Sequence, residues 1–156
     1  MGIVVNNLEE SLKKWTEIYQ AGPWKIMTHS SRYLRDVYAE ETVVDKEWEF
    51  RVALSMMGGN QLELIEPAYG VPIYQDFLKK NGEGIHHFKE IMPDDEMEER
   101  IKQYQEQGIK ILFGGDFFGA KFYYPETIPL LGVQIEIGNG AVAQLPPDYD
   151  QVAYYP

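Results

Sequence analysis

The feature that most constrains the fold is a six-residue pattern that occurs twice in the chain. Residues 59–64 and residues 132–137 both read glycine, any residue, glutamine, an aliphatic residue, glutamate and an aliphatic residue. The alternation of apolar and polar side chains is typical of a β-strand with one buried face. A helix with the same four-then-three spacing of apolar residues precedes each copy: Leu8, Leu12 and Trp15, then Met97, Ile101 and Tyr104. The sequence therefore predicts two related modules.

Each module is predicted to contain one strand, one helix and three further strands, written βαβββ. Because short alternating strands joined by turns favour antiparallel pairing, we expect an α+β fold with a mostly antiparallel sheet. One of the expected strands lies around Val37 to Val44. The predicted organisation is a single domain over residues 1–138, made of module one (1–67), a linker (68–83) and module two (84–138), followed by an extended tail (139–156).

The helix ends are also marked in the sequence. Asn7 begins a capping-box pattern, since a glutamate follows it three residues later. Gly22 is expected to provide the left-handed residue that ends the first helix. Asp94 and Asp95 are expected to cap the start of the second helix.

Charge and composition exclude several classes of function. The chain has 14 Lys and Arg residues against 25 Asp and Glu residues and a net charge of -11, which argues against nucleic acid and anionic membranes as partners. The chain contains no cysteine, so thiolate metal sites and disulfides are excluded. No apolar run approaches the length of about 20 residues that spans a bilayer, and no signal peptide precedes the first strand. We expect a cytoplasmic protein that acts on a small molecule.

Two acidic strands and one histidine form the candidate site. Alternation places Glu63 and Glu136 on the polar faces of their strands. These faces either contact water or line a common cavity together with His87, and carboxylates with an imidazole suit a divalent metal. His86 and His87 are adjacent and therefore point to opposite faces of a strand, so at most one of them enters such a cavity.

With these residues in place, the chain resembles the vicinal-oxygen-chelate superfamily, also called the glyoxalase/bleomycin-resistance/dioxygenase superfamily. More narrowly, it is similar to the methylmalonyl-CoA epimerase-like branch. The Gly-Glu-Gly-Ile-His-His stretch at residues 82–87 is the most specific match. The matching segments are Gly2–Ser11, Gln61–Pro67, Phe77–His87 and Leu131–Glu136.

The resemblance implies a glyoxalase-like α+β fold in which paired βαβββ modules form a cupped, mostly antiparallel sheet. It also implies frequent assembly as a homodimer and a divalent metal such as Zn, Co, Ni or Mn. By residue-to-residue matching, it implies Glu63, His87 and Glu136 as metal ligands. The fourth ligand of the family would precede Met1. Lys89 departs from the family pattern: its ammonium would repel a metal, pair with Glu63 or Glu136 in the metal's place, or hold a substrate carboxylate.

The resemblance also implies a reaction, for which three hypotheses remain open. The first is a metal-dependent epimerase or isomerase that removes a proton next to the carbonyl of an acyl-CoA thioester such as methylmalonyl-CoA. Glu136 is the preferred base and Glu49 the second candidate, while Lys89 and Tyr124 are the expected substrate-binding residues. The second is a glyoxalase I-type lyase (lactoylglutathione lyase) acting on a hemithioacetal. The third is a non-catalytic small-molecule-binding or resistance protein of the same fold.

Overall fold

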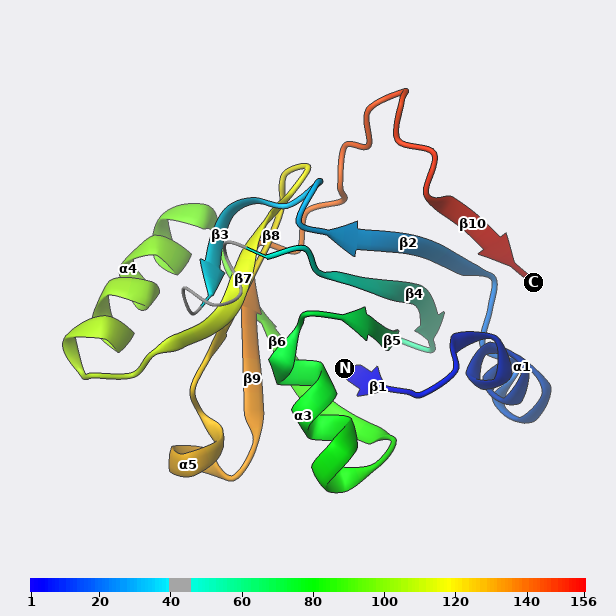
Figure 1. Ribbon diagram of the computed structural model, residues 1–156, viewed down its shortest axis with the longest axis horizontal. Coiled ribbons are helices and arrows are strands. Elements are labelled where there is room, and N and C mark those ends of the chain that lie inside the picture. Colours follow the sequence, from blue (N-terminus) through cyan, green and yellow to red (C-terminus); the bar gives the residue numbers. More distant parts are fainter. Residues whose placement is uncertain (40–45) are drawn as a thin grey trace. The chain divides into compact units, whose positions relative to one another are not determined.

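The computed structural model describes residues 1–39 and 46–156 of the chain (Figure 1). The chain divides into two compact units, and each combines helices with strands, so the predicted α+β class is confirmed. The first unit comprises Met1–Ser30, Glu47–His86 and Pro147–Pro156, and the second unit comprises Ser31–Lys46 and His87–Pro146.

The first unit contains a mixed sheet covered by two helices. Its strands are β1 (Gly2–Val4), β2 (Trp24–Ser30), β4 (Glu49–Met57), β5 (Asn60–Tyr69) and β10 (Val152–Tyr155), and its helices are α1 (Leu8–Tyr19) and α3 (Pro72–Asn81). The strand order is β10-β2-β4-β5-β1. Only the β1–β5 pair among these described strands is parallel. Helix α1 contacts β4 and β5, and α3 contacts β5 and β1.

The second unit repeats this arrangement. Its strands are β3 (Arg35–Ala39), β6 (Gly84–Ile91, of which residues 87–91 belong to this unit), β7 (Ile111–Phe117), β8 (Ala120–Pro125) and β9 (Gln134–Gly138), and its helices are α4 (Asp94–Glu106) and α5 (Ile128–Leu131). The order is β6-β9-β8-β7-β3, and β6 and β9 are the parallel pair. The predicted βαβββ pattern therefore occurs as β1-α1-β2-β4-β5 and as β6-α4-β7-β8-β9.

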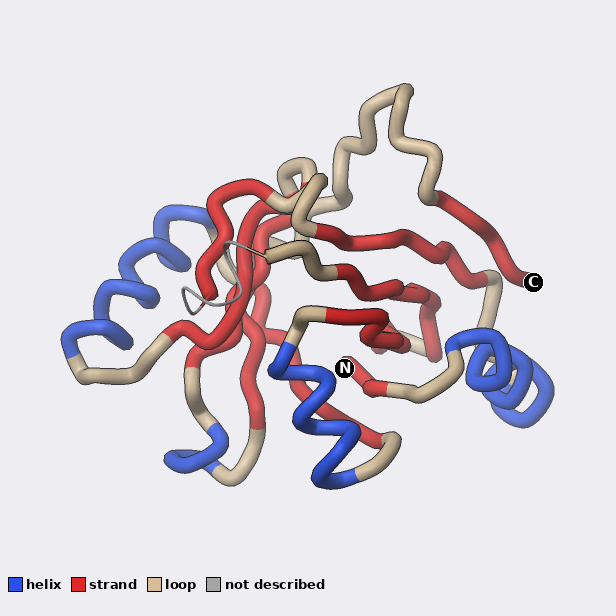
Figure 2. Tube along the Cα trace, viewed as in Figure 1, coloured by secondary structure: helices blue, strands red, loops and turns tan. Residues whose placement is uncertain are grey.

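Each sheet also gains one strand from a distant part of the sequence. The strand expected around Val37 to Val44 is β3 as far as Ala39, and it pairs with β7 of the second unit. Residues 40–44 of that expected strand lie outside the described residues. The last strand, β10, pairs with the edge of β2 in the first unit. It follows an irregular connection that forms most of the predicted tail (Figure 2).

The apolar stripe of each long helix builds the core of its unit. In the first unit, Leu8 and Leu12 of α1 are fully buried against Trp24, Leu62 and Leu64. The second unit repeats this packing with another set of buried residues: Met92, Met97, Ile101, Tyr123 and Ile137. The helical spacing that the sequence repeats is thus the spacing of core residues.

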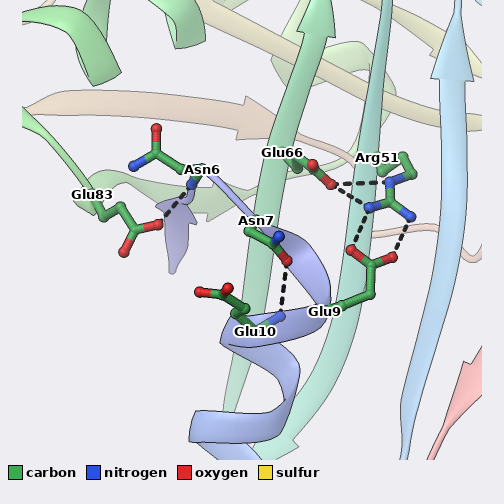
Figure 3. A network of polar contacts seen from close by, with 7 residues as sticks. All are labelled: Asn6, Asn7, Glu9, Glu10, Arg51, Glu66 and Glu83. Atoms are coloured by element: carbon green, nitrogen blue, oxygen red, sulfur yellow. Dashed lines mark hydrogen bonds and ion pairs between the residues drawn. The ribbon is translucent and has the colours of Figure 1, made fainter.

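The helix ends were predicted less well than the helices. The Asn7 side chain accepts a hydrogen bond from the Glu10 backbone N–H, as the capping pattern predicts (Figure 3). The prediction for Gly22 is wrong, because the left-handed residue that ends α1 is Gln20, whose φ is 55°. The prediction for Asp94 and Asp95 is also wrong: the N-cap is Pro93, and the Asp94 carboxylate accepts hydrogen bonds from Lys121 and Asn139 instead.

No helix within residues 1–39 and 46–156 has both the length and the apolar character needed to cross a membrane.

Candidate active site

Three neighbouring strands of the second unit position the candidate site. In the parallel pair β6–β9, His87 lies opposite Gln134 and Lys89 lies opposite Glu136. His87 and Lys89 are two residues apart and therefore share one face of β6. The antiparallel neighbour of β9 is β8, which supplies Tyr124. The strand register therefore gathers an imidazole, an ammonium, a phenol and a carboxylate.

Glu136 is the centre of this group. One of its oxygens, Oε1, lies 2.7 Å from Nζ of Lys89. The other oxygen, Oε2, lies 2.8 Å from Nε2 of His87 and accepts a hydrogen bond of 3.1 Å from the Tyr124 hydroxyl. The Tyr124 ring also packs edge-on against the His87 ring, with centroids 5.1 Å apart. Both carboxylate oxygens are thus held in fixed directions.

The electrostatic state of Glu136 follows from these contacts. Its residue is only 3 % exposed, and such burial by itself raises a carboxyl pKa. The charge of Lys89, followed by the charge and hydrogen bond of His87, outweighs burial and holds the pKa of Glu136 well below its usual range. Glu136 is therefore ionised at neutral pH although it is buried. An ionised carboxylate is able to bind a metal ion or accept a proton.

Gln134 adds a polar group that the sequence marks only as part of the repeat. It is buried, and its amide nitrogen donates to the backbone oxygens of Pro125 and Ile135. Because these carbonyls only accept, the orientation of the amide is fixed. Its Oε1 atom finds no hydrogen-bond donor among the described residues. Leaving a buried acceptor without a donor costs about 1–3 kcal/mol, so this oxygen is available to a ligand.

The donor set of the second unit fits a divalent metal in type and spacing. Imidazole nitrogen and carboxylate oxygen are ligands that Zn, Mn, Co and Ni accept. Two ligand atoms that each lie about 2 Å from one metal are separated by about 3 Å, which is close to the 2.8 Å between His87 Nε2 and Glu136 Oε2. Lys89 occupies the other oxygen, and its ammonium has no lone pair to offer a metal.

The remaining candidate residues lie in the first unit. Glu63 is on β5, half-buried, and lies opposite Gly2 of β1 and Leu54 of β4. Glu49 begins β4, opposite Ser30. His86 is packed edge-on against the rings of Tyr74 and Phe77 of α3. The two adjacent histidines thus have different surroundings, as the alternation predicts: His86 packs against aromatic rings, and His87 faces the carboxylate.

Comparison with known proteins identifies the fold. A family model described as the glyoxalase/bleomycin resistance protein/dioxygenase superfamily matches residues 1–124. A search of curated proteins finds no significant match.

Similar solved structures include several methylmalonyl-CoA epimerases. The Mycobacterium tuberculosis enzyme is 18% identical, with 90% of this chain and 85% of that chain covered and a TM-score of 0.61. A methylmalonyl-CoA epimerase in complex with methylmalonyl-CoA and NH4+ is 20% identical, with 93% and 94% covered and a TM-score of 0.61. A single-residue variant of the Streptomyces coelicolor enzyme, in complex with 2-nitronate-propionyl-CoA, is 19% identical, with 93% and 94% covered and a TM-score of 0.62. At these identities the likeness establishes the fold.

Proposed function

The chain belongs to the glyoxalase/bleomycin resistance protein/dioxygenase superfamily, and we propose that it is a metal-dependent epimerase or isomerase that removes a proton next to a carbonyl group. The observation that carries this proposal is the ionised, buried carboxylate of Glu136, held between His87, Lys89 and Tyr124. The proposed substrate is an acyl-CoA thioester, because similarly folded epimerases are known in complex with such ligands.

His87 and Glu136 would hold the metal, together with Glu63 of the first unit. Each of the three side chains offers one ligand atom. Glu63 is included because it has the same place in its six-residue pattern as Glu136 has in the second copy. When bound, a divalent ion such as Zn, Co, Ni or Mn would polarise the substrate carbonyl and so acidify the neighbouring C–H group.

Glu136 is the proposed base. A general base works best when its pKa lies near the operating pH, whereas the contact with Lys89 holds the pKa of Glu136 low. A substrate that draws the Lys89 ammonium onto its own carboxylate would remove the main charge that lowers this pKa. Lys89 is suited to this step, because its side chain is 27% exposed while that of Glu136 is 4% exposed.

Tyr124 and Glu49 have supporting roles in the proposal. Tyr124 donates its hydroxyl hydrogen to Glu136 Oε2, and the same hydroxyl would bind the substrate when the carboxylate turns toward the reacting carbon. Glu49 is the second candidate base. It would explain any exchange that persists after Glu136 has lost its charge.

The experiment that tests this function follows exchange of the α-proton of methylmalonyl-CoA in deuterated water. Glu136→Gln preserves side-chain volume and removes the base, so exchange should fall by about 10²–10⁴. Glu90→Gln is the matched control, because Glu90 is an exposed neighbour on β6 that pairs with Arg100 at 3.5 Å. Metal content is measured in all three proteins.

Two results would contradict the proposal. Undiminished exchange in Glu136→Gln at equal metal content would remove Glu136 as the base. Absence of exchange in the metal-loaded wild type would exclude the epimerase reaction on this substrate. The same samples are then assayed with a hemithioacetal for lyase activity.

One observation favours a second candidate function, a non-catalytic binding protein. Lys89 balances the charge of Glu136 from within the chain, as expected of a site that only holds a ligand. Tight binding of a small molecule by metal-free protein, without proton exchange, would favour this function.

A further inference from the structure

The contact between Lys89 and Glu136 is built into the sheet. The two residues are direct partners in the parallel β6–β9 pair, and Nζ lies 2.7 Å from Oε1. The carboxylate of Glu136 is almost completely buried. The ammonium of Lys89 compensates its negative charge at this short distance. In a parallel pair this register is fixed by the backbone hydrogen bonds along both strands.

Gly138 provides the space in which the Lys89 side chain lies. A Cβ atom at position 138 would come within 2.8 Å of Lys89 Cε and 3.0 Å of Nζ, and within 2.5 Å of the Lys121 carbonyl oxygen. These distances are too short for carbon atoms in normal contact. The absence of a side chain at Gly138 therefore allows the lysine stem to lie against β9 and reach Glu136.

The ammonium of Lys89 lowers the net negative charge that the site presents to a metal ion. With Lys89 in place, the charges of Glu136 and Lys89 cancel, whereas divalent metals prefer anionic ligand sets. Oε1 is already engaged, and a metal on Oε2 would lie close to a positive charge in a buried setting, where repulsion between charges is strong.

We propose that Lys89 is a tethered cation that competes with the metal for Glu136, so that this protein binds a divalent metal weakly until an anionic group of the substrate draws Lys89 away. This inference rests on the proposed function, in which His87, Glu136 and Glu63 hold the metal. It goes beyond that function because it makes metal affinity depend on the substrate. By thermodynamic linkage, the metal and a carboxylate-bearing substrate raise each other's affinity by the same factor.

The first test is a calorimetric titration of Mn²⁺ into metal-free protein without substrate. Lys89→Met keeps the unbranched stem of the side chain and removes the ammonium group. This variant should bind Mn²⁺ at least tenfold more tightly, equivalent to about 1.4 kcal/mol. Lys121→Met is the matched control: Lys121 also forms a 2.7 Å ion pair in the second unit, with Asp94, and its loss should change the affinity less than twofold. Equal affinities of wild type and Lys89→Met would overturn the proposal, and so would absence of Mn²⁺ binding in both.

The second test measures the coupling with two thioesters that differ by one carboxylate. The Mn²⁺ affinity of the wild type is measured in saturating methylmalonyl-CoA and in saturating propionyl-CoA, and a titration of each thioester without protein is subtracted. The affinity should be at least tenfold higher with methylmalonyl-CoA. In Lys89→Met the two thioesters should give the same Mn²⁺ affinity. A tenfold difference that persists in Lys89→Met would overturn the role of Lys89. Should Lys89→Met fail to fold by circular dichroism, Lys89→Gln takes its place.

These tests separate the inference from the proposed reaction. If Lys89→Met binds metal more tightly but the wild type shows no α-proton exchange, the competition between Lys89 and the metal is supported and the epimerase reaction is excluded. Metal-dependent exchange in the wild type with equal Mn²⁺ affinities in the two proteins supports the enzyme and overturns the tethered cation.

Discussion

The two units each contain a cluster of carboxylates and cations, and the clusters differ in burial far more than in contact distance. In the first unit, Arg51 donates two hydrogen bonds of 2.7 and 2.9 Å to Glu9 and also bonds Glu66 (Figure 3). In the second unit, Lys89 lies 2.7 Å from Glu136. The side chain of Glu9 is 65% exposed, whereas that of Glu136 is 4% exposed.

Because the two clusters differ in burial, their contributions to stability differ. Arg51 connects α1 to β4 and β5 at the surface, where water already solvates the charges and such pairs contribute little free energy. In the second unit, dehydration of Glu136 has to be offset by its partners, which makes the cluster a weak source of net stability and very sensitive to loss of one member. Burial, with its partners, thus keeps the charge of Glu136 in a defined position.

The largest expected effect is a loss of unfolding free energy in Lys89→Met, which would sharpen this comparison. The variant leaves the buried Glu136 without its ammonium. Loss of one partner from a buried pair costs about 3–5 kcal/mol, and since Lys89 reaches solvent we expect about 2–4 kcal/mol at pH 7. Urea unfolding followed by circular dichroism measures it.

Lys102→Met is the control for this change, because Lys102 is exposed on α4 of the same unit. Its effect should stay within about 0.5 kcal/mol. Equal unfolding midpoints for the two variants would contradict the view that Lys89 compensates a buried charge.

Acid should reduce the difference in unfolding free energy between wild type and Lys89→Met. The pKa of Glu136 in the folded protein lies below its ordinary value of 4.5. The resulting stabilisation is therefore fully present above that value and is lost progressively as the pH falls below it. Between pH 6 and pH 3, the free-energy difference between the two proteins should shrink by on the order of 1 kcal/mol.

The other acidic groups do not disturb this measurement. The pKa values of Glu9 and Asp94 are also lowered, by Arg51 and by Lys121, but both groups are present in the two proteins and cancel in the difference. A difference that stays constant from pH 6 to pH 3 would show that Lys89 acts by packing rather than by charge.

How far the sequence predicts these features depends on whether they are local. The strands β5 and β9 follow from alternation within six residues, and α1 and α4 follow from helical spacing. The partner of β3 does not follow, because its five residues alternate without a strongly apolar face. The pairing depends on distant residues: Tyr38 lies opposite Gly114 and packs edge-on against the Tyr123 ring.

The same distinction applies to the site. Residue types and the family resemblance select His87, Lys89 and Glu136, but Lys89 had two possible carboxylate partners in the sequence. The contact with Glu136 depends on the register between β6 and β9, which is a long-range property. The buried oxygen of Gln134 is also invisible in the sequence, because Gln61, its equivalent in the first copy of the pattern, is exposed.

Arg51→Met is expected to have a smaller effect than Lys89→Met although it breaks more contacts. Both carboxylates regain water when the guanidinium is lost, so we expect a cost of about 1 kcal/mol. All three tryptophans, Trp15, Trp24 and Trp48, belong to the first unit, so urea unfolding followed by indole fluorescence reports on this variant. Arg100→Met in the second unit is the control. A cost as large as that of Lys89→Met would break the comparison.

The smallest expected effect is the change that salt makes to the stability costs of Arg51→Met and Lys89→Met. At 1 M ionic strength the screening length is about 3 Å, and charges at the surface are screened much more than buried ones. The cost of Arg51→Met should therefore fall by about 0.3–0.5 kcal/mol between 0.05 and 1 M NaCl, measured by indole fluorescence. The cost of Lys89→Met should change by less than about 0.2 kcal/mol, because salt screens a buried charge pair much less than a surface pair. Since salt also changes the stability of the wild type, each cost is taken as a difference from the wild type at the same salt concentration. Equal salt dependence of the two costs would mean that salt screens Glu136 as strongly as the surface carboxylates, and the argument that burial separates the clusters would fail.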